Sequence, residues 1–144
     1  MAQPLIHLHQ APRRRATAAA LLLALATSLA QAAADTTPAQ QQQRFASQAG
    51  STPQAERGKL FFNSTHGGEW SCASCHGQQP GQAGKHASTG KTIAPMAPAF
   101  NPQAFTDSAK VDKWFRRNCG DVLKRECSAG EKADVLAYLI SVKP

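Results

Sequence analysis

The cysteine and histidine residues with a chemically informative spacing lie in the stretch EWSCASCHGQQ, residues 69–79. Its centre is Cys72-Ala73-Ser74-Cys75-His76, and Cys-x-x-Cys-His is the attachment pattern of c-type haem. Two thiols three residues apart on one turn of backbone meet the two vinyl groups of a porphyrin and form thioethers. The next residue then directs its imidazole at the iron. We therefore predict one covalent haem c, held by Cys72 and Cys75, with His76 as the proximal ligand.

The first 34 residues have the layout of a secretory signal peptide. Three arginines, residues 13–15, precede an apolar run, residues 16–30, that is too short to span a bilayer, and small residues suit cleavage after Ala32 or Ala34. We predict Sec-type export to the periplasm, with residues 1–34 as the signal peptide and residues 35–144 as one cytochrome c domain. Twin-arginine export and a buried apolar helix are the alternative interpretations.

The net charge excludes some classes of partner. Removal of residues 1–34 takes away three arginines and no acidic residue, which lowers the formal charge from +7 to +4. Such a small and scattered charge does not favour nucleic acid, although it suits an acidic redox partner. No later apolar run is long enough to anchor the exported chain in a membrane.

Cys119 and Cys127 remain, in a chain predicted to reach an oxidising compartment. We predict a disulfide between them, worth about 2–3 kcal/mol by loop-closure entropy; two buried free thiols are the alternative. These cysteines could instead complete a zinc site with Cys72 and Cys75, but four cysteine ligands are uncommon in an exported protein. A thioredoxin-like redox pair needs a βαβ setting, and no strand of useful length is predicted.

The ligand opposite His76 is left open by the residues alone. Met96 is the one methionine after the predicted signal peptide and follows His76 by 20 residues, and a thioether is the usual sixth ligand of small electron carriers. Asn118 stands 42 residues after His76, just before the last predicted helix, where small class I cytochromes c generally place that methionine. A helix C-cap is the alternative role of Asn118, because asparagine tolerates the left-handed conformation. His66 and His86 are typical of solvated loops.

The elements that must position these residues are predicted to be helices joined by a long loop. Thr37, Pro38 and Gly50 have the capping chemistry of a helix over residues 37–50, for which a disordered arm is the alternative. Gly58, inside a second helix over residues 51–62, indicates close approach of another helix. The third and fourth helices are predicted over residues 106–118 and 128–142, and residues 77–102 are predicted to be loop.

Two features of the later helices bear on the haem. Val111, Trp114, Phe115 and Asn118 share one face of the third helix, and we expect Trp114 to pack against the haem. Ser128-x-x-Glu131 opens the fourth helix as a capping box. An apolar core from so few side chains is marginal at this size, so the haem disc is expected to complete it.

Four segments together resemble the sphaeroides haem protein (SHP) family of monohaem cytochromes c: CASCH, TGKTIAPMAPAFNPQAFTD, KVDKWFRRNC and GEKADVLAYLIS. The likeness runs from about residue 38 to residue 142. The resemblance implies an all-α, class I cytochrome c fold, with Asn118 as the sixth ligand and a disulfide between Cys119 and Cys127. Met96 stands where the family pattern has leucine.

The resemblance also implies a function. It implies electron transfer combined with reversible binding of a diatomic gas, oxygen or nitric oxide, at the iron when Asn118 is displaced. It further implies a dihaem cytochrome c as electron donor and a membrane cytochrome b nearby in the pathway. A conventional His/Met carrier that uses Met96, and an electron-donating subunit of an oxidoreductase, are the alternatives. No separate acid–base group of residues indicates a catalytic pocket.

Overall fold

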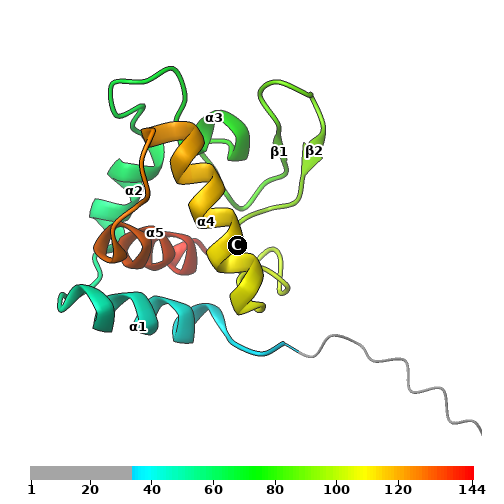
Figure 1. Ribbon diagram of the computed structural model, residues 1–144. Coiled ribbons are helices and arrows are strands. Elements are labelled where there is room, and N and C mark those ends of the chain that lie inside the picture. The colour runs from blue at the N-terminus through cyan, green and yellow to red at the C-terminus, as the bar shows by residue number, and fades with distance from the viewer. Residues whose placement is uncertain (1–33) are drawn as a thin grey trace, which may run out of the picture. The chain divides into compact units, whose positions relative to one another are not determined.

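Three helices pack around the apolar core in the computed structural model, which describes residues 34–144. They are α1 (Pro38–Ala49), α2 (Ala55–Asn63) and α5 (Ala129–Ser141), and α5 lies against both of the others. Figure 1 shows α1 and α5 stacked, with α2 running past one end of α5. The predicted signal peptide lies outside the described residues, apart from its last residue.

Helix α1 forms as its capping residues predict. The Thr37 hydroxyl accepts a hydrogen bond from the backbone N–H of Gln40 at 3.2 Å, Pro38 opens the helix, and Gly50 ends it with a φ of 59°. The helix buries Phe45 completely against α5 and α4, and this apolar contact holds α1 on the core. The predicted helix is therefore confirmed over a disordered arm.

Helices α2 and α5 cross where the sequence predicts a close approach. A Cβ atom added to Gly58 would lie 1.9 Å from the backbone oxygen of Asp134, so only glycine lets the two backbones meet there. Helix α2 begins at Ala55, later than predicted, because the Asp134 carboxylate accepts from the backbone N–H of Gln54 at 2.7 Å and so caps the helix from α5. No side chain of the preceding Ser-Thr-Pro segment caps it.

Helix α4 (Ser108–Leu123) is longer than predicted. Asp107 caps it, accepting from the backbone N–H of Lys110 at 2.9 Å. The helix then continues through Asn118 and ends at Lys124, which adopts the left-handed conformation with a φ of 58°. The interpretation of Asn118 as a helix C-cap is therefore wrong.

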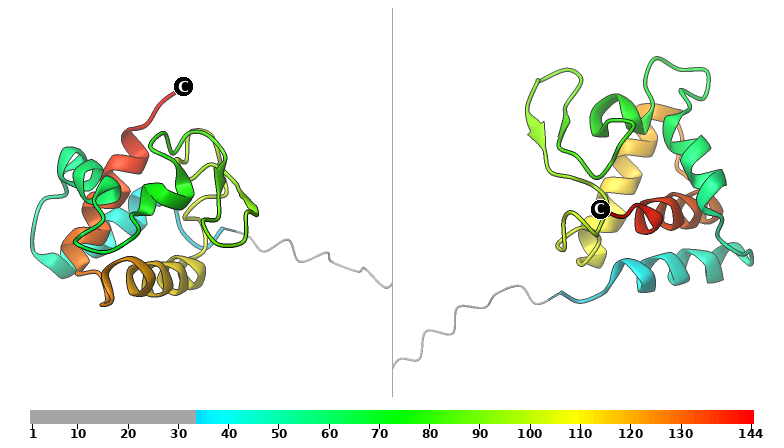
Figure 2. Two further views of the ribbon diagram at one scale, coloured as in Figure 1. Left: turned by 90° about the horizontal axis from the view of Figure 1, so that it is seen from above. Right: turned by 180° about the vertical axis from the view of Figure 1, so that it is seen from behind.

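The segment from Cys72 to Ile93 contains three short elements that periodicity did not predict. Helix α3 (Cys72–His76) is too short to show a 3.6-residue repeat, and strands β1 (Gly84–Lys85) and β2 (Thr92–Ile93) form an antiparallel pair in the predicted loop. Gly84 pairs with Ile93 and Lys85 pairs with Thr92. Figure 2 shows this hairpin beside α3, with which β1 is in contact.

Candidate haem site

Helix α3 holds the three residues of the haem-attachment pattern on one helical turn. The hydroxyl of Ser71 accepts from the backbone N–H of Ser74 at 3.2 Å, and the hydroxyl of Ser74 accepts from the backbone N–H of Ser71 at 2.9 Å. This reciprocal cap stabilises a helix that is otherwise too short to persist. Because side chains three or four residues apart share a helix face, Cys75 and His76 both lie on the face of Cys72.

Both cysteines of α3 are free thiols in the structure. The Cys72 side chain packs against the core cluster that contains Phe62 and Leu139, and burial raises the pKa of its thiol to about 11. The Cys75 sulfur accepts from the backbone N–H of Ala87 at 3.3 Å. The two thiols have different surroundings, and neither is consumed in a disulfide.

His76 presents an imidazole that suits metal ligation. Burial, followed by the charge of His86, lowers the pKa of His76 below its ordinary value, which favours the neutral, metal-binding form. Its Nδ1 atom is buried and has no hydrogen-bond partner among the described residues. The ring lies 6.4 Å, centroid to centroid, from the buried ring of Phe62, so α2 packs against the side of the proposed proximal ligand.

Asn118 lies within α4, half-buried and one residue before the buried Cys119. Its neighbours on the helix face are Trp114, four residues earlier, and Phe115, three residues earlier. Phe115 packs against both core clusters, which orients α4 about its own axis. Asn118 therefore projects from a helix whose rotation is fixed by the core, rather than from a loop.

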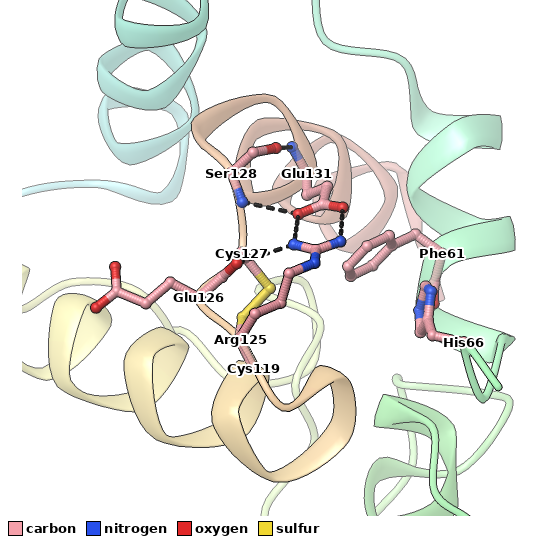
Figure 3. Close-up of a disulfide and its surroundings, with 8 residues drawn as sticks. All are labelled: Phe61, His66, Cys119, Arg125, Glu126, Cys127, Ser128 and Glu131. Carbon is pink, nitrogen blue, oxygen red and sulfur yellow. Dashed lines mark hydrogen bonds and ion pairs between the residues drawn. A yellow bond between two sulfur atoms is a disulfide. The ribbon is translucent and has the colours of Figure 1, made fainter. Parts of the chain in front are cut away.

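Cys119 and Cys127 form a disulfide in the structure, with their Cα atoms 5.5 Å apart. Both are buried, and the bond ties the C-terminal part of α4 to the residue that precedes the N-cap of α5. Figure 3 shows the pair beside Arg125, whose guanidinium binds both carboxylate oxygens of Glu131 at 2.7 and 2.8 Å. The cysteines are therefore bonded to each other rather than available for a zinc site.

The Met96 side chain faces the apolar core. Its side chain packs against the cluster of Phe62, Val135, Tyr138 and Leu139, and its backbone N–H donates to the oxygen of Pro80 at 2.8 Å. Phe62 is the same ring that approaches His76. Met96 and His76 thus both lie near the core cluster that contains Phe62.

His66 and His86 make local contacts in their loops. The Nε2 atom of the exposed His66 lies 2.9 Å from the backbone oxygen of Phe61. The Nδ1 atom of His86 lies 3.2 Å from the hydroxyl of Ser88 and accepts from the backbone N–H of Thr89 at 3.3 Å. Each imidazole therefore has a hydrogen-bond partner close to it in sequence, as is typical of loop histidines.

Trp114, expected to pack against the haem, is 46% exposed in the structure. Lys113 and Arg117 lie over its ring, at 5.3 and 5.6 Å from the centroid. A large apolar surface covered only by two cations is available for a further contact.

One residue of the site escaped the sequence analysis. A Cβ atom added to Gly84 would lie 2.2 Å from the backbone oxygen of Cys75 and 2.9 Å from the Cα atom of His76. Strand β1 can therefore approach the back of α3 only because residue 84 has no side chain. A glycine in a glycine-rich loop carries no signal of such a contact, so only the structure reveals it.

The residues present fit a covalently attached haem. Two free thiols and a neutral imidazole with an unpartnered buried nitrogen lie on one turn of helix, which is the donor set that c-type attachment requires. The described residues offer no group of three or more histidine, cysteine or acidic side chains that could hold a metal ion by themselves. The porphyrin's own nitrogens would supply the remaining ligands of the iron.

Comparison with known proteins gives the same result. Residues 48–139 match the family described as "Domain of unknown function (DUF1924)". Cytochrome c-type protein SHP of Cereibacter sphaeroides is 48% identical over 99 residues, which cover 66% of this chain and 76% of that protein. The chain belongs to the SHP family.

Solved structures support the fold. The structure of oxidised SHP, described as an oxygen binding cytochrome c, matches with a TM-score of 0.69 and 49% identity, covering 73% of this chain and 96% of that one. The solution structure of cytochrome c'' from Methylophilus methylotrophus, described as giving insights into haem-ligand detachment, matches with a TM-score of 0.64 and 37% identity, covering 72% and 92%.

Membership of the SHP family confirms two predictions. The fold is the predicted all-α, class I-like cytochrome c fold, and the cofactor is covalently bound haem c, since the family consists of c-type cytochromes. Within residues 34–144, the structure contains no helix that is long and apolar enough to cross a bilayer.

Proposed function

We propose that this chain is an exported monohaem cytochrome c that transfers electrons and reversibly binds a diatomic gas, oxygen or nitric oxide, at the iron when Asn118 is displaced. The observation that carries the proposal is the pair of free thiols and the imidazole on α3, in a chain similar to an oxygen binding cytochrome c over 96% of that structure. The bound haem would supply the redox-active iron and its open coordination position.

The residues of α3 attach and hold the cofactor in this proposal. Cys72 and Cys75 would hold the haem as thioethers, and His76 would bind its iron through the imidazole. The buried Phe62 ring beside His76 restricts the imidazole and excludes water from that side.

Asn118 is proposed as the distal ligand. An amide oxygen is a weak, neutral ligand with little affinity for ferrous iron, whereas a thioether favours the ferrous state and raises the potential. Reduction would therefore weaken the bond to Asn118 and open a position for a gas molecule. The position of Asn118 inside α4, tied by the disulfide of the next residue, supports a ligand that returns to the same place.

The packing of Met96 supports a structural role for this residue. Its side chain is partly buried against the core cluster of Phe62, Val135, Tyr138 and Leu139, so packing accounts for an apolar residue at this position. The conventional His/Met carrier is therefore the weaker candidate. Trp114 is proposed to cover part of the haem face next to Asn118, since its exposed ring lies one helical turn from that residue.

The cellular setting is also a proposal. The buried disulfide suits the oxidising periplasm, and residues 1–34 would be removed as a Sec-type signal peptide. Redox partners would be a dihaem cytochrome c and, further along the pathway, a membrane cytochrome b. The mature charge of +4 would favour an acidic partner surface.

Absorption spectra of two variants test the proposed ligand. Asn118→Ala is expected to make the ferric protein high-spin and to leave carbon monoxide binding to the ferrous protein intact. Met96→Leu is expected to leave both spectra as in the wild type. A methionine–iron charge-transfer band in the ferric wild type, lost in Met96→Leu, would reject Asn118 as the ligand.

A further inference from the structure

Helix α4 is held differently from the other long helices. The backbone of α5 lies in close contact with those of α1 and α2, whereas α4 makes no comparably close approach to another helix within residues 34–144. Figure 1 shows α4 running across the stack of α1 and α5 rather than along it. The position of α4, and with it the position of Asn118, depends on side-chain contacts at a few points.

The C-terminal part of α4 is fixed covalently by Cys119, and its N-terminal part is held by the buried Val111 in the core and by polar side chains. Gln41 Nε2 donates to the hydroxyl of Ser108 at 2.9 Å, and the two guanidinium nitrogens of Arg44 donate to the Asp112 carboxylate at 2.6 and 3.1 Å. The hydrogen bond from Arg44 holds the pKa of Asp112 below its ordinary value. We call these two contacts, Gln41–Ser108 and Arg44–Asp112, the α1–α4 clamp.

The α1–α4 clamp favours a defined position of α4 against α1 over maximal stability of their interface. Gln41 is 2% exposed, and its Oε1 atom and the Nε atom of Arg44 are buried without hydrogen-bond partners among the described residues. Unsatisfied buried polar atoms cost free energy, so an apolar contact would stabilise this interface better. The bidentate ion pair adds to the core packing of α4 a contact of defined geometry between α1 and α4.

A direct line of contacts connects the clamp to Asn118. Phe45, next to Arg44, packs edge to face against Phe115 at 5.6 Å between ring centroids, and Phe115 precedes Asn118 by three residues. Asp112 precedes Asn118 by six residues, or about 9 Å along the helix axis. A rigid helix transmits a small shift over that distance, and a ligand must be placed to about 0.5 Å.

We propose that Gln41 and Arg44 of α1 are positioning residues for the distal ligand: the α1–α4 clamp sets how well Asn118 reaches the iron and thereby the fraction of protein open to an incoming ligand. This inference rests on the proposed function, in which Asn118 binds the iron. Helix α1 then regulates ligand access at the haem without touching the haem.

The test compares Arg44→Met with Lys110→Met in the ferric, haem-loaded protein. Both variants remove one positive charge that pairs with an aspartate; the Lys110–Asp107 pair, at 3.1 Å, lies within the first turn of α4 and does not reach α1. Arg44→Met is expected to raise the high-spin fraction and the apparent affinity for cyanide by the same factor, about threefold to tenfold. Lys110→Met is expected to change neither.

Three further measurements sharpen the test. Gln41→Met is expected to shift the spectrum in the same direction, and the double variant Arg44→Met/Asp112→Asn is expected to shift it no further than Arg44→Met alone. The pair is 33% and 41% exposed at its two side chains, so salt should raise the high-spin fraction of the wild type but not of Arg44→Met.

The possible failures are distinguishable. If Asn118→Ala leaves the ferric spectrum unchanged, the proposed function fails and the clamp has no ligand to position. If Asn118→Ala produces the high-spin form but Arg44→Met lowers only the melting temperature, with spectrum and cyanide affinity unchanged, the clamp is merely structural and the inference is overturned.

Discussion

Replacing Gly58 with alanine tests the α2–α5 crossing on which the fold depends. The added Cβ atom would lie 1.9 Å from the oxygen and 2.4 Å from the carbonyl carbon of Asp134, whereas ordinary contacts begin at 3.4 Å. The two backbones would have to separate by about 1.5 Å at this point. Because the clash involves backbone atoms, no side-chain rotation can relieve it.

The free energy of unfolding should fall despite the better helix propensity of alanine. Alanine gains about 1 kcal/mol over glycine inside a helix. Overpacking a tight contact costs about 1–3 kcal/mol, and separation of the helices also loosens the buried side chains of Phe62, Val135 and Leu139. We expect a net loss of about 2 kcal/mol, or about 8 °C in melting temperature for a domain of this size.

Chemical unfolding of the haem-loaded protein, followed by circular dichroism, measures this loss. Gly120→Ala is the matched control, since Gly120 lies inside α4 and an added Cβ atom would meet nothing within 4 Å. This variant is expected to gain about 0.5–1 kcal/mol. The packing argument would be refuted if the Gly58→Ala protein were as stable as the wild type or as stable as the Gly120→Ala protein.

Three other outcomes are expected. Replacing Cys119 and Cys127 together with serine should cost about 2–3 kcal/mol in urea unfolding, and an unchanged midpoint would contradict it. Arg125 holds the pKa of Glu131 below its ordinary value, so the Arg125–Glu131 pair stabilises the protein above the ordinary glutamate pKa. This stabilisation is lost as pH falls through the lowered pKa of Glu131. Glu131→Gln should therefore flatten the acid side of a curve of unfolding free energy against pH, and an unaltered curve would count against the pair. Thr37→Ala should lower the free energy of unfolding by about 1 kcal/mol, because it removes the cap of α1. An unchanged free energy of unfolding would show that the hydrogen bond from Gln40 to Thr37 contributes nothing to stability.

The cofactor and several helix ends were predictable from the sequence because they depend on local spacing. Cys72, Cys75 and His76 specify haem attachment within five residues, and membership of the SHP family confirms the cofactor. The caps at Thr37 and Ser128 work within one turn of backbone, and both form as predicted. Covalent spacing and capping need no knowledge of distant residues.

The tertiary structure alone decided where α4 ends and what holds it. The helix continues to Leu123 and ends with Lys124 in the left-handed conformation, which no local pattern indicated. The clamp joins Arg44 to Asp112, 68 residues away in sequence. Contacts between distant segments follow from how the helices pack, so the sequence identified the haem donors, whereas the fold determined the support behind Asn118.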